Sequence, residues 1–231
     1  MQIQKKSNDA HPHGIDITDK LREAIINRDE FSPGSPLRID ALATRFGVSH
    51  MPVRAALQRL ESEGLISALP NKGARVVDVN ETFVADLMDI RMMVESYLAR
   101  RAAQRITDTV LTELVELQSA HEAAVGSGDF QQALDANRAF HRHIHQAAGN
   151  RDAILILERH WLLIRALWRR YGPRPERFQG VIADHRQMLA AFAARDAEGA
   201  AAITAAHTAK AKQQLLEAMH AHFASEGHPD D

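Results

Sequence analysis

The sequence of 231 residues contains no cysteine. Neither a disulfide nor a thiolate-bound metal can therefore hold the fold together, so any bound transition metal needs imidazole, carboxylate or amide ligands. Imidazoles are plentiful, because the chain carries 13 histidines.

Long apolar runs and a strong net charge are also missing. No run approaches the roughly 18 apolar residues of a membrane-spanning helix. The N-terminal stretch Met1–Lys6 is not followed by the apolar segment of a signal peptide, so we expect a cytoplasmic protein that does not enter a membrane. The net charge of −2 excludes a general polyanion binder, so DNA binding would depend on locally placed basic groups.

Turn-forming residues divide the chain into two unlike parts near residue 79. Before this point short proline- and glycine-containing stretches interrupt the sequence, whereas beyond it alanine- and leucine-rich stretches follow helical spacing. Asn80 is placed to cap the first helix of the second part. The predicted divisions are a DNA-binding domain over residues 1–78, a linker over 79–86, a helical domain over 87–223 and a tail over 224–231.

The first part predicts three short helices. Apolar residues recur at helical spacing over residues 17–25 and again over 39–46. Gly47 suits the position after the second helix, and Ser49 suits the N-cap of a third helix with Pro52 in its first turn. This order is typical of a helix-turn-helix, whose second helix enters the major groove.

An alternating segment at residues 65–77 predicts a small β-hairpin, which behind a helix-turn-helix would be a wing. His50, Met51 and Arg54 are predicted to reach base edges, and the other basic groups to contact phosphates. The full set of predicted DNA contacts is Arg45, Ser49, His50, Met51, Arg54, Lys72 and Arg75. The spacing alone also fits a three-helix domain without DNA, in which Arg54 is an ordinary surface residue.

The second part predicts about six helices and no strand. Glycine-containing breaks near residues 126–128, 149–150 and 171–175 separate the helices, and Asp129 is placed to cap one of them. We therefore predict a mainly α fold, in which a winged helix-turn-helix of three helices and a β-hairpin precedes an antiparallel bundle of about six helices.

Four polar residues have a spacing that suits a metal site inside such a bundle. Asn137 and His141 are four residues apart on one helix, and His185 and His207 follow on two later helices. Three imidazoles and an amide oxygen can hold a divalent ion such as Zn, Ni or Mn and leave a coordination position open for a ligand.

Other interpretations of these histidines stay open. With 13 histidines, three on separate helices can be ordinary core residues with no functional metal. A metal hydrolase or lyase would need a general base beside the ion, but no H-E-x-x-H motif occurs and Asp184 is a weak candidate. In a metal site, Glu95 or Asp184 could instead accept a hydrogen bond from a ligating imidazole.

The segment PGSPLRIDALATRFGVSHMPVRAALQRLESEGLISALPNKGARV resembles the winged helix-turn-helix of GntR-type bacterial transcription regulators. The family usually has arginine where this chain has His50 and often glutamate where it has Ala55, so only Arg54 of the base-reading arginine pair is present. The resemblance implies a bacterial homodimer, usually a repressor, on double-stranded operator DNA with two-fold related half-sites.

The segments DLMDIRMMVESYLARRAA, ANRAFHRHIHQAAGN and DHRQMLAAFAARDAEGAA resemble the all-helical FCD effector domain of the FadR-like branch of that family. In its metal-containing members an Asp or Asn precedes a His by four residues, and two further histidines follow. Asn137, His141, His185 and His207 match these positions. The resemblance implies a small carboxylate effector beside the metal and argues against a fatty-acyl effector.

Arg91 matches an arginine in the first helix of the effector domain. It is the predicted carboxylate clamp, and Glu95 and Arg165 complete the predicted effector site. The alternative for Arg91 is an ion pair with Glu95, four residues further on. The predicted function is a ligand-responsive regulator, not an enzyme, in which an organic acid shifts the population between two arrangements of the dimer.

Overall fold

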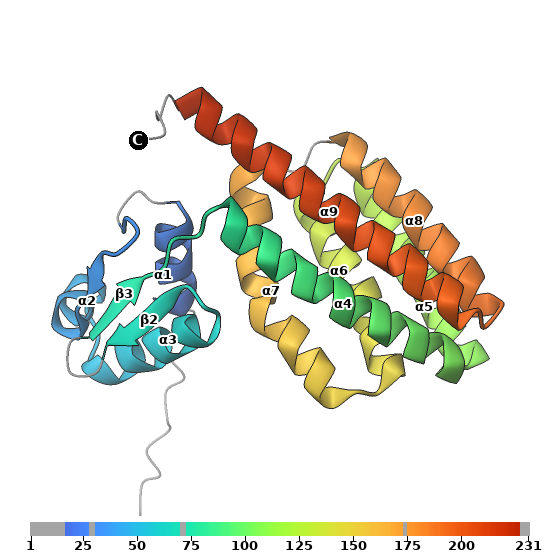
Figure 1. Ribbon diagram of the computed structural model, residues 1–231, viewed down its shortest axis with the longest axis horizontal. Helices are drawn as coiled ribbons and strands as arrows, with labels where there is room; N and C mark the ends of the chain where they lie inside the picture. The colour runs from blue at the N-terminus through green and yellow to red at the C-terminus, as the bar shows by residue number, and fades with distance from the viewer. Residues whose placement is uncertain (1–16, 28–30, 70–72, 173–174, 227–231) are drawn as a thin grey trace, which may run out of the picture. The chain divides into compact units, whose positions relative to one another are not determined.

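The computed structural model describes residues 17–27, 31–69, 73–172 and 175–226 (Figure 1). The chain divides into two compact units, Met1–Val77 and Asp78–Asp231. Both are built mainly from helices, which confirms the predicted fold class. None of the described helices has the length and apolar character that a membrane span requires.

The described residues of the first unit form three helices and a three-stranded antiparallel sheet in the order β1-β3-β2. The hairpin of β2 and β3 is the predicted wing, with Ile66 opposite Val76. Strand β1 was not predicted, because two residues beginning with a proline are too short to show alternation. The elements are α1 (Ile17–Ile26), β1 (Pro36–Leu37), α2 (Ile39–Phe46), α3 (His50–Ser62), β2 (Ile66–Leu69) and β3 (Gly73–Val76).

The turn between α2 and α3 has the predicted backbone geometry. Gly47 adopts a left-handed conformation with φ of 63°, where glycine avoids the steric penalty of a side chain. Ser49 occupies the extended N-cap position of α3, but within the described residues its side chain makes no capping hydrogen bond. The fully buried Val53 and Leu60 anchor α3 in the core of this unit.

A buried ion pair also fixes the end of α3. The Arg22 guanidinium of α1 donates from Nε and Nη2 to the two carboxylate oxygens of Glu63, at 2.8 and 2.9 Å. Both side chains are only 3% exposed, so removal of either one would take the main partner from a buried charge. No local pattern in the sequence predicted this pair, because its members lie 41 residues apart.

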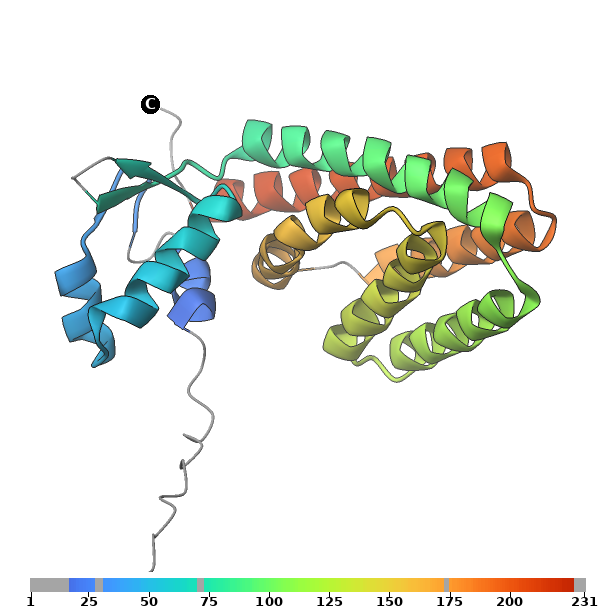
Figure 2. The same ribbon diagram turned by 90° about the horizontal axis from the view of Figure 1, so that it is seen from below.

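In the second unit, the residues that the structure describes form a bundle of six helices. Helices α4 and α9 pack side by side on one side of the bundle, and α5 and α6 form a pair on the other (Figures 1 and 2). The helices are α4 (Glu81–Arg105), α5 (Asp108–Gly126), α6 (Phe130–Ala148), α7 (Arg151–Tyr171), α8 (Pro175–Ala193) and α9 (Ala197–Glu226).

Two predicted boundaries need correction. Helix α4 begins at Glu81, so most of the expected linker over 79–86 is helical. The predicted cap explains this start, because the Asn80 side chain accepts a hydrogen bond from the Phe83 N–H at 2.9 Å. At the other end, α9 continues to Glu226 and includes the beginning of the predicted tail over 224–231.

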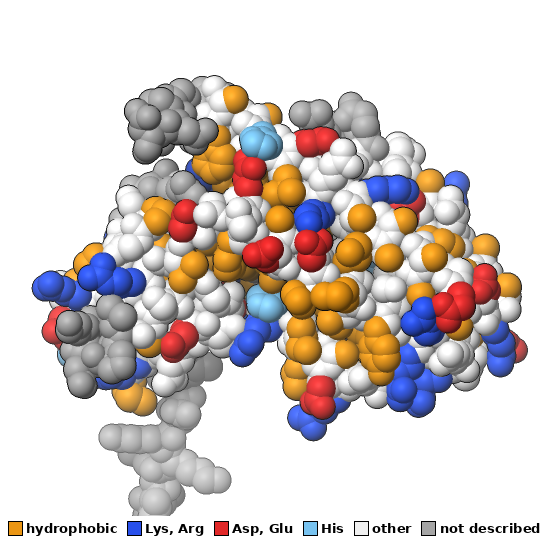
Figure 3. All heavy atoms as spheres, in the orientation of Figure 1, with side chains coloured by type: hydrophobic (Ala, Val, Ile, Leu, Met, Phe, Trp, Pro, Cys, Tyr) orange, Lys and Arg blue, Asp and Glu red, His pale blue; other side chains and the backbone are white. Residues whose placement is uncertain are grey.

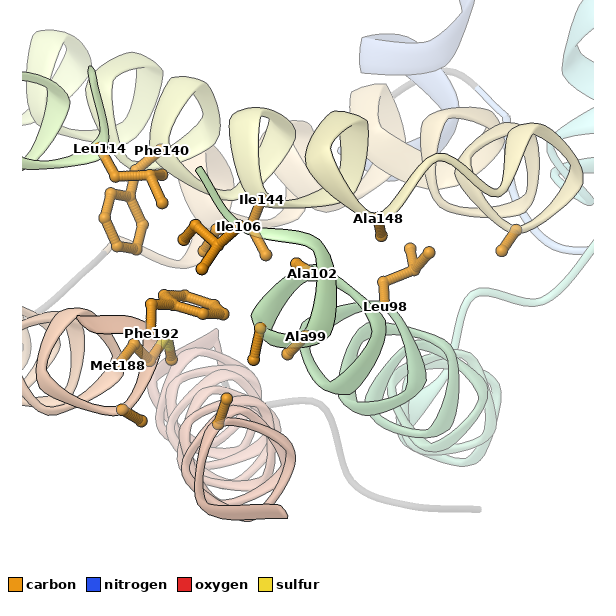
Figure 4. Close-up of a cluster of buried hydrophobic side chains, with 14 of the residues drawn as sticks. Leu98, Ala99, Ala102, Ile106, Leu114, Phe140, Ile144, Ala148, Met188 and Phe192 are labelled. Carbon is orange, nitrogen blue, oxygen red and sulfur yellow. The ribbon is translucent and has the colours of Figure 1, made fainter. Parts of the chain in front are cut away.

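The core of the bundle also positions the candidate site. Phe140 of α6 and Phe192 of α8 point into one buried cluster, in which the alanines of α4 allow close packing (Figure 4). The Phe140 ring stacks on the His185 ring with centroids 4.2 Å apart. The residue after Phe140 is His141, so the packing of α6 into the core fixes the direction of that histidine as well.

Candidate functional site

Three histidines from three helices converge in the second unit. His141 of α6, His185 of α8 and His207 of α9 offer ring nitrogens that all lie within 4.8 Å of one another. The Nε2 atoms of His141 and His185 are 3.2 Å apart. In the described part of the chain, this is the one cluster of His, Asp or Glu side chains close enough to share a metal ion. The predicted convergence of the three histidines is confirmed.

Hydrogen bonds to neighbouring side chains orient two of these rings. His185 Nδ1 lies 2.7 Å from Gln118 Oε1, and Gln118 uses its Nε2 to donate to Glu122 at 2.9 Å. Because the amide oxygen can only accept, His185 carries its proton on Nδ1 and presents the Nε2 lone pair to the cluster.

His207 is oriented in the same way by a carboxylate. Its Nδ1 lies 3.2 Å from Asp184 Oδ2, and Lys210 Nζ donates to Asp184 Oδ1 at 2.6 Å. Of the two predicted acceptors, Asp184 is therefore the one that contacts an imidazole of the cluster. Glu95 has different partners, since it pairs with Arg91 and accepts from Thr208 Oγ1 at 2.7 Å.

The electrostatics of the cluster favour neutral imidazoles at His141 and His185. Burial lowers the pKa of both rings well below the ordinary value. Neutral imidazole is the form that donates a lone pair to a metal. These two rings are therefore ready to bind a cation at neutral pH without losing a proton.

Asn137 supplies the fourth predicted donor, one helical turn before His141 on α6. Its side chain lines the same cavity as His141 and His207, and its Oδ1 is buried without a hydrogen-bond partner among the described residues. A buried acceptor without a donor costs free energy, which a bound cation would recover. Three imidazoles and a free amide oxygen fit a divalent ion such as Zn, Ni or Mn.

Of the three predicted effector residues, Arg91 and Glu95 line the cavity and Arg165 does not. Arg91 lines the cavity and also forms the alternative ion pair with Glu95, while its Nη1 donates to the Leu157 carbonyl at 3.2 Å. Burial raises the pKa of Glu95, but the nearby positive charges, first that of Arg91, lower it to about 2. Arg165 is not among the residues that line the cavity, since its Nη2 instead lies 3.8 Å from Asp135.

Sequence reasoning missed the remaining cationic and aromatic residues of the cavity. Arg138 lies over the Trp161 ring at 4.7 Å, and Arg177 lies over the Trp168 ring at 3.8 Å. Arg177 precedes His185 by two helical turns on α8, so both project from the same face. This spacing is the one signal in the sequence that could have indicated Arg177.

The predicted DNA contacts of α3 lie on its solvent side. His50, Met51 and Arg54 are exposed, whereas Val53 and Leu57 on the other side are buried. Arg54 has no ion-pair partner within the described ranges. His50 Nε2 lies 3.2 Å from Asp40 Oδ1 of α2, a contact that sequence reasoning did not foresee.

The other predicted DNA contacts belong to the turn and the wing. Arg45 is exposed and lies 5.6 Å from the Phe31 and Phe46 rings. Arg75 is exposed on β3 and donates to the Gly34 carbonyl at 3.0 Å. Lys72 lies outside the described residues.

Comparison with known proteins gives consistent matches for both units. Residues 15–76 match the family described as bacterial regulatory proteins, gntR family, and residues 86–210 match the FCD domain. The chain is 31% identical over 176 residues to the transcriptional regulator McbR of Escherichia coli (strain K12). The aligned region covers 72% of this chain and 76% of that protein. Over 195 residues it is 29% identical to the transcriptional repressor GlaR of the same organism, with 81% and 88% covered.

A solved structure supports the same assignment. The structure of E. coli McbR/YncC matches with a TM-score of 0.67 and 25% sequence identity, over 87% of this chain and 95% of that chain. These relatives are transcription regulators and not enzymes. The chain belongs to the GntR family of bacterial regulatory proteins and is a transcription regulator with an FCD domain.

Proposed function

We propose that this regulator binds a small organic acid beside a divalent metal ion in its helical unit and changes its affinity for operator DNA in response. The observation that carries the proposal is the convergence of His141, His185 and His207. Two of them, His141 and His207, line a cavity together with Asn137, whose amide oxygen has no partner among the described residues. The metal, when bound, supplies a Lewis-acidic centre for a carboxylate. The arginines of the cavity add further positive charge.

The proposed DNA contacts are made by the exposed side of α3 and by the wing. Arg54 reads a base edge, while Arg45, Ser49, Lys72 and Arg75 contact phosphates. His50 and Met51 complete the surface that enters the groove. Operators with two-fold related half-sites require two copies of this surface, and therefore a homodimer.

A face of α4 and α7 is suited to that dimer. Five large apolar side chains are exposed there, and hydrophobic atoms gather over these two helices (Figure 3). The two segments are neighbours, since Asn150 Nδ2 at the start of α7 donates to Tyr97 Oη of α4 at 3.1 Å. The residues of this dimer face are Ile90, Met93, Tyr97, Leu155 and Ile156. The proposed occupant is a second copy of this face, because a two-fold operator needs a symmetric pair of chains.

The ion pair of α4 offers a physical route from effector to DNA. Glu95 connects Arg91 of α4 to Thr208 of α9. An effector carboxylate that binds Arg91 competes with Glu95 for the guanidinium and thereby alters how α4 is held against α9. Helix α4 follows directly after the DNA-binding unit in the chain. The change in DNA affinity can be no larger than the difference in effector affinity between the two states.

Metal content tests the core of this proposal. We expect the purified protein to bind about one zinc ion per chain, and the double variant His141→Ala, His185→Ala to bind none in an equilibrium measurement. The control is His143→Ala, a histidine of the same helix that pairs with Glu113 outside the cluster. Stoichiometric zinc in the double variant would refute the site and favour histidines that act only as core residues.

A further inference from the structure

We propose that the effector carries two acidic groups, and that Arg177 binds the second group while the metal at the histidine cluster binds the first. This inference rests on the proposed function and extends it from a carboxylate in general to a diacid. It identifies Arg177 as a specificity-determining residue.

The first observation is that Arg177 is buried in the cavity without a carboxylate partner among the described residues. Its side chain is only 8% exposed, and it lines the cavity that contains His141 and His207. No carboxylate of the described residues pairs with it, and its Nε is buried without an acceptor. Burial lowers the pKa of the guanidinium to about 10, which leaves it charged at neutral pH. A buried charge without a partner is costly, so the site is built for an anion.

The other arginines of the cavity differ in this respect. Arg91 pairs with Glu95, and Arg138 and Arg142 both lie 3.5 Å from Glu158. Arg177 is therefore the one arginine of this cavity that has no carboxylate partner in the described structure. A bidentate fork that remains free is suited to a carboxylate.

The position of Arg177 relative to the histidines is the second observation. It lies two helical turns before His185 on α8 and stacks on Trp168, which holds the guanidinium over the ring at 3.8 Å. Arg177, His141 and His207 line the same cavity. One small molecule in this cavity can therefore contact the metal and Arg177 together.

The balance of charges in the cavity also favours a diacid. Among the residues whose side chains are described, the lining contains four arginines, namely Arg91, Arg138, Arg142 and Arg177, but two acidic residues, Glu95 and Glu158. A divalent ion raises this excess of positive charge. A diacid compensates more of this positive charge than a monoacid can. It also places one carboxylate at the metal and the other at Arg177.

Calorimetric titration of the zinc-loaded protein tests the inference. The probes are malonate, succinate and adipate, each compared with the monoacid of equal carbon number, namely propanoate, butanoate and hexanoate. We expect at least one diacid to bind 10-fold or more tightly than its monoacid. Arg177→Met should abolish this preference, because it should lower the affinity for diacids more than the affinity for monoacids. Arg138→Met is the control, because Arg138 stacks on Trp161 but already has Glu158 as a partner, and it should keep the preference.

Two results would overturn the inference. One is equal affinity for diacids and monoacids in the zinc-loaded wild type, a comparison that depends on no variant. The other is a retained diacid preference in Arg177→Met. If Arg177→Met does not fold, Arg177→Lys replaces it, and an unchanged preference in that variant contradicts the role of the guanidinium fork. Failure of the proposed function is recognised separately, because the wild type then takes up no zinc before any acid is added.

Discussion

His50 and Arg54 lie one helical turn apart on the exposed side of α3, but their surroundings differ. His50 has Asp40 as a neighbour at 3.2 Å, whereas Arg54 is left without a carboxylate in the described part of the unit. A free guanidinium can hold a guanine edge bidentately. Arg54 is therefore the residue from which we expect most of the base-specific binding.

Replacement of this arginine gives a prediction for DNA affinity. Arg54→Ala should weaken binding about 5- to 150-fold, because one bidentate base contact is worth about 1–3 kcal/mol. Fluorescence anisotropy with DNA selected from a random-sequence pool measures the change. Arg59→Ala serves as the control, because Arg59 of the same helix lies 3.6 Å from Glu63. Wild-type affinity in Arg54→Ala would show that another residue reads the DNA.

A buried histidine outside the metal cluster gives a prediction for acid stability. His121 is fully buried, and neither ring nitrogen has a partner among the described residues. Burial lowers its pKa from 6.5 to about 4. The folded state therefore disfavours the proton that the unfolded chain takes up, so this residue's contribution to stability is complete above pH 6.5 and is lost as the pH falls to 4.

The variant His121→Phe isolates this contribution. Between pH 6 and 4.5, the free energy of unfolding should fall less steeply in the variant, by up to about 1.4 kcal/mol per pH unit. Both tryptophans of the chain lie in α7, so their fluorescence during urea unfolding reports on the helical unit. Identical slopes in the two proteins would mean that His121 is accessible to protons in the folded state.

Individual residues were predictable where their role depends on spacing along one helix. Asn137 and His141 share a face because they are four positions apart, and the distances to His185 and His207 match later helices of the bundle. Arg177 was missed because its isolation from carboxylates is a property of tertiary packing. Arg165 was predicted to bind the effector, but its guanidinium faces Asp135. Consecutive residues of a helix such as α7 point toward different sides, so the sequence alone did not show whether Arg165 faces the cavity.

At the scale of elements, α4 carries the two proposed surfaces on opposite sides. Arg91 and Glu95 face the cavity, while Ile90, Met93 and Tyr97 are exposed to solvent. Apolar side chains grouped on one exposed surface favour association with a partner. The dimer face and the effector site therefore share one helix, and displacement of one side of α4 affects the other.

A charge on the dimer face tests this arrangement. Met93→Glu should convert the dimer to a monomer, because the contact between two copies would bury the carboxylate without a partner. Analytical ultracentrifugation measures the mass. Val115→Glu is the matched control, since Val115 is an exposed apolar residue of α5 outside the dimer face. A dimer in Met93→Glu would place the interface elsewhere.

Most elements were predictable because helical periodicity and capping residues agree along the sequence. Asn80, Asp129 and Asn150 each accept a hydrogen bond from the backbone N–H three residues on. The linker was predicted too long because the apolar pattern was traced only from Leu87, although the capped helix already begins at Glu81. Strand β1 exists only through its pairing with β3, which no local pattern can reveal.

For the whole molecule, the central claim is that the metal, the acid and the DNA are thermodynamically linked. Effector binding in the helical unit must favour one arrangement of the dimer, and the same coupling free energy must appear as a change in DNA affinity. For a repressor that the acid releases, this change is a loss of affinity. Typical couplings of about 1–3 kcal/mol correspond to roughly 5- to 150-fold.

The most direct test measures operator affinity with and without succinate, in zinc-loaded protein and in protein stripped by a chelator. Our account predicts that succinate weakens DNA binding at least 5-fold in the zinc-loaded protein and has no effect on the stripped protein. The double variant His141→Ala, His185→Ala should behave like the stripped protein under both conditions. An equal effect of succinate with and without zinc, or no effect of any diacid on the zinc-loaded protein, would contradict the account.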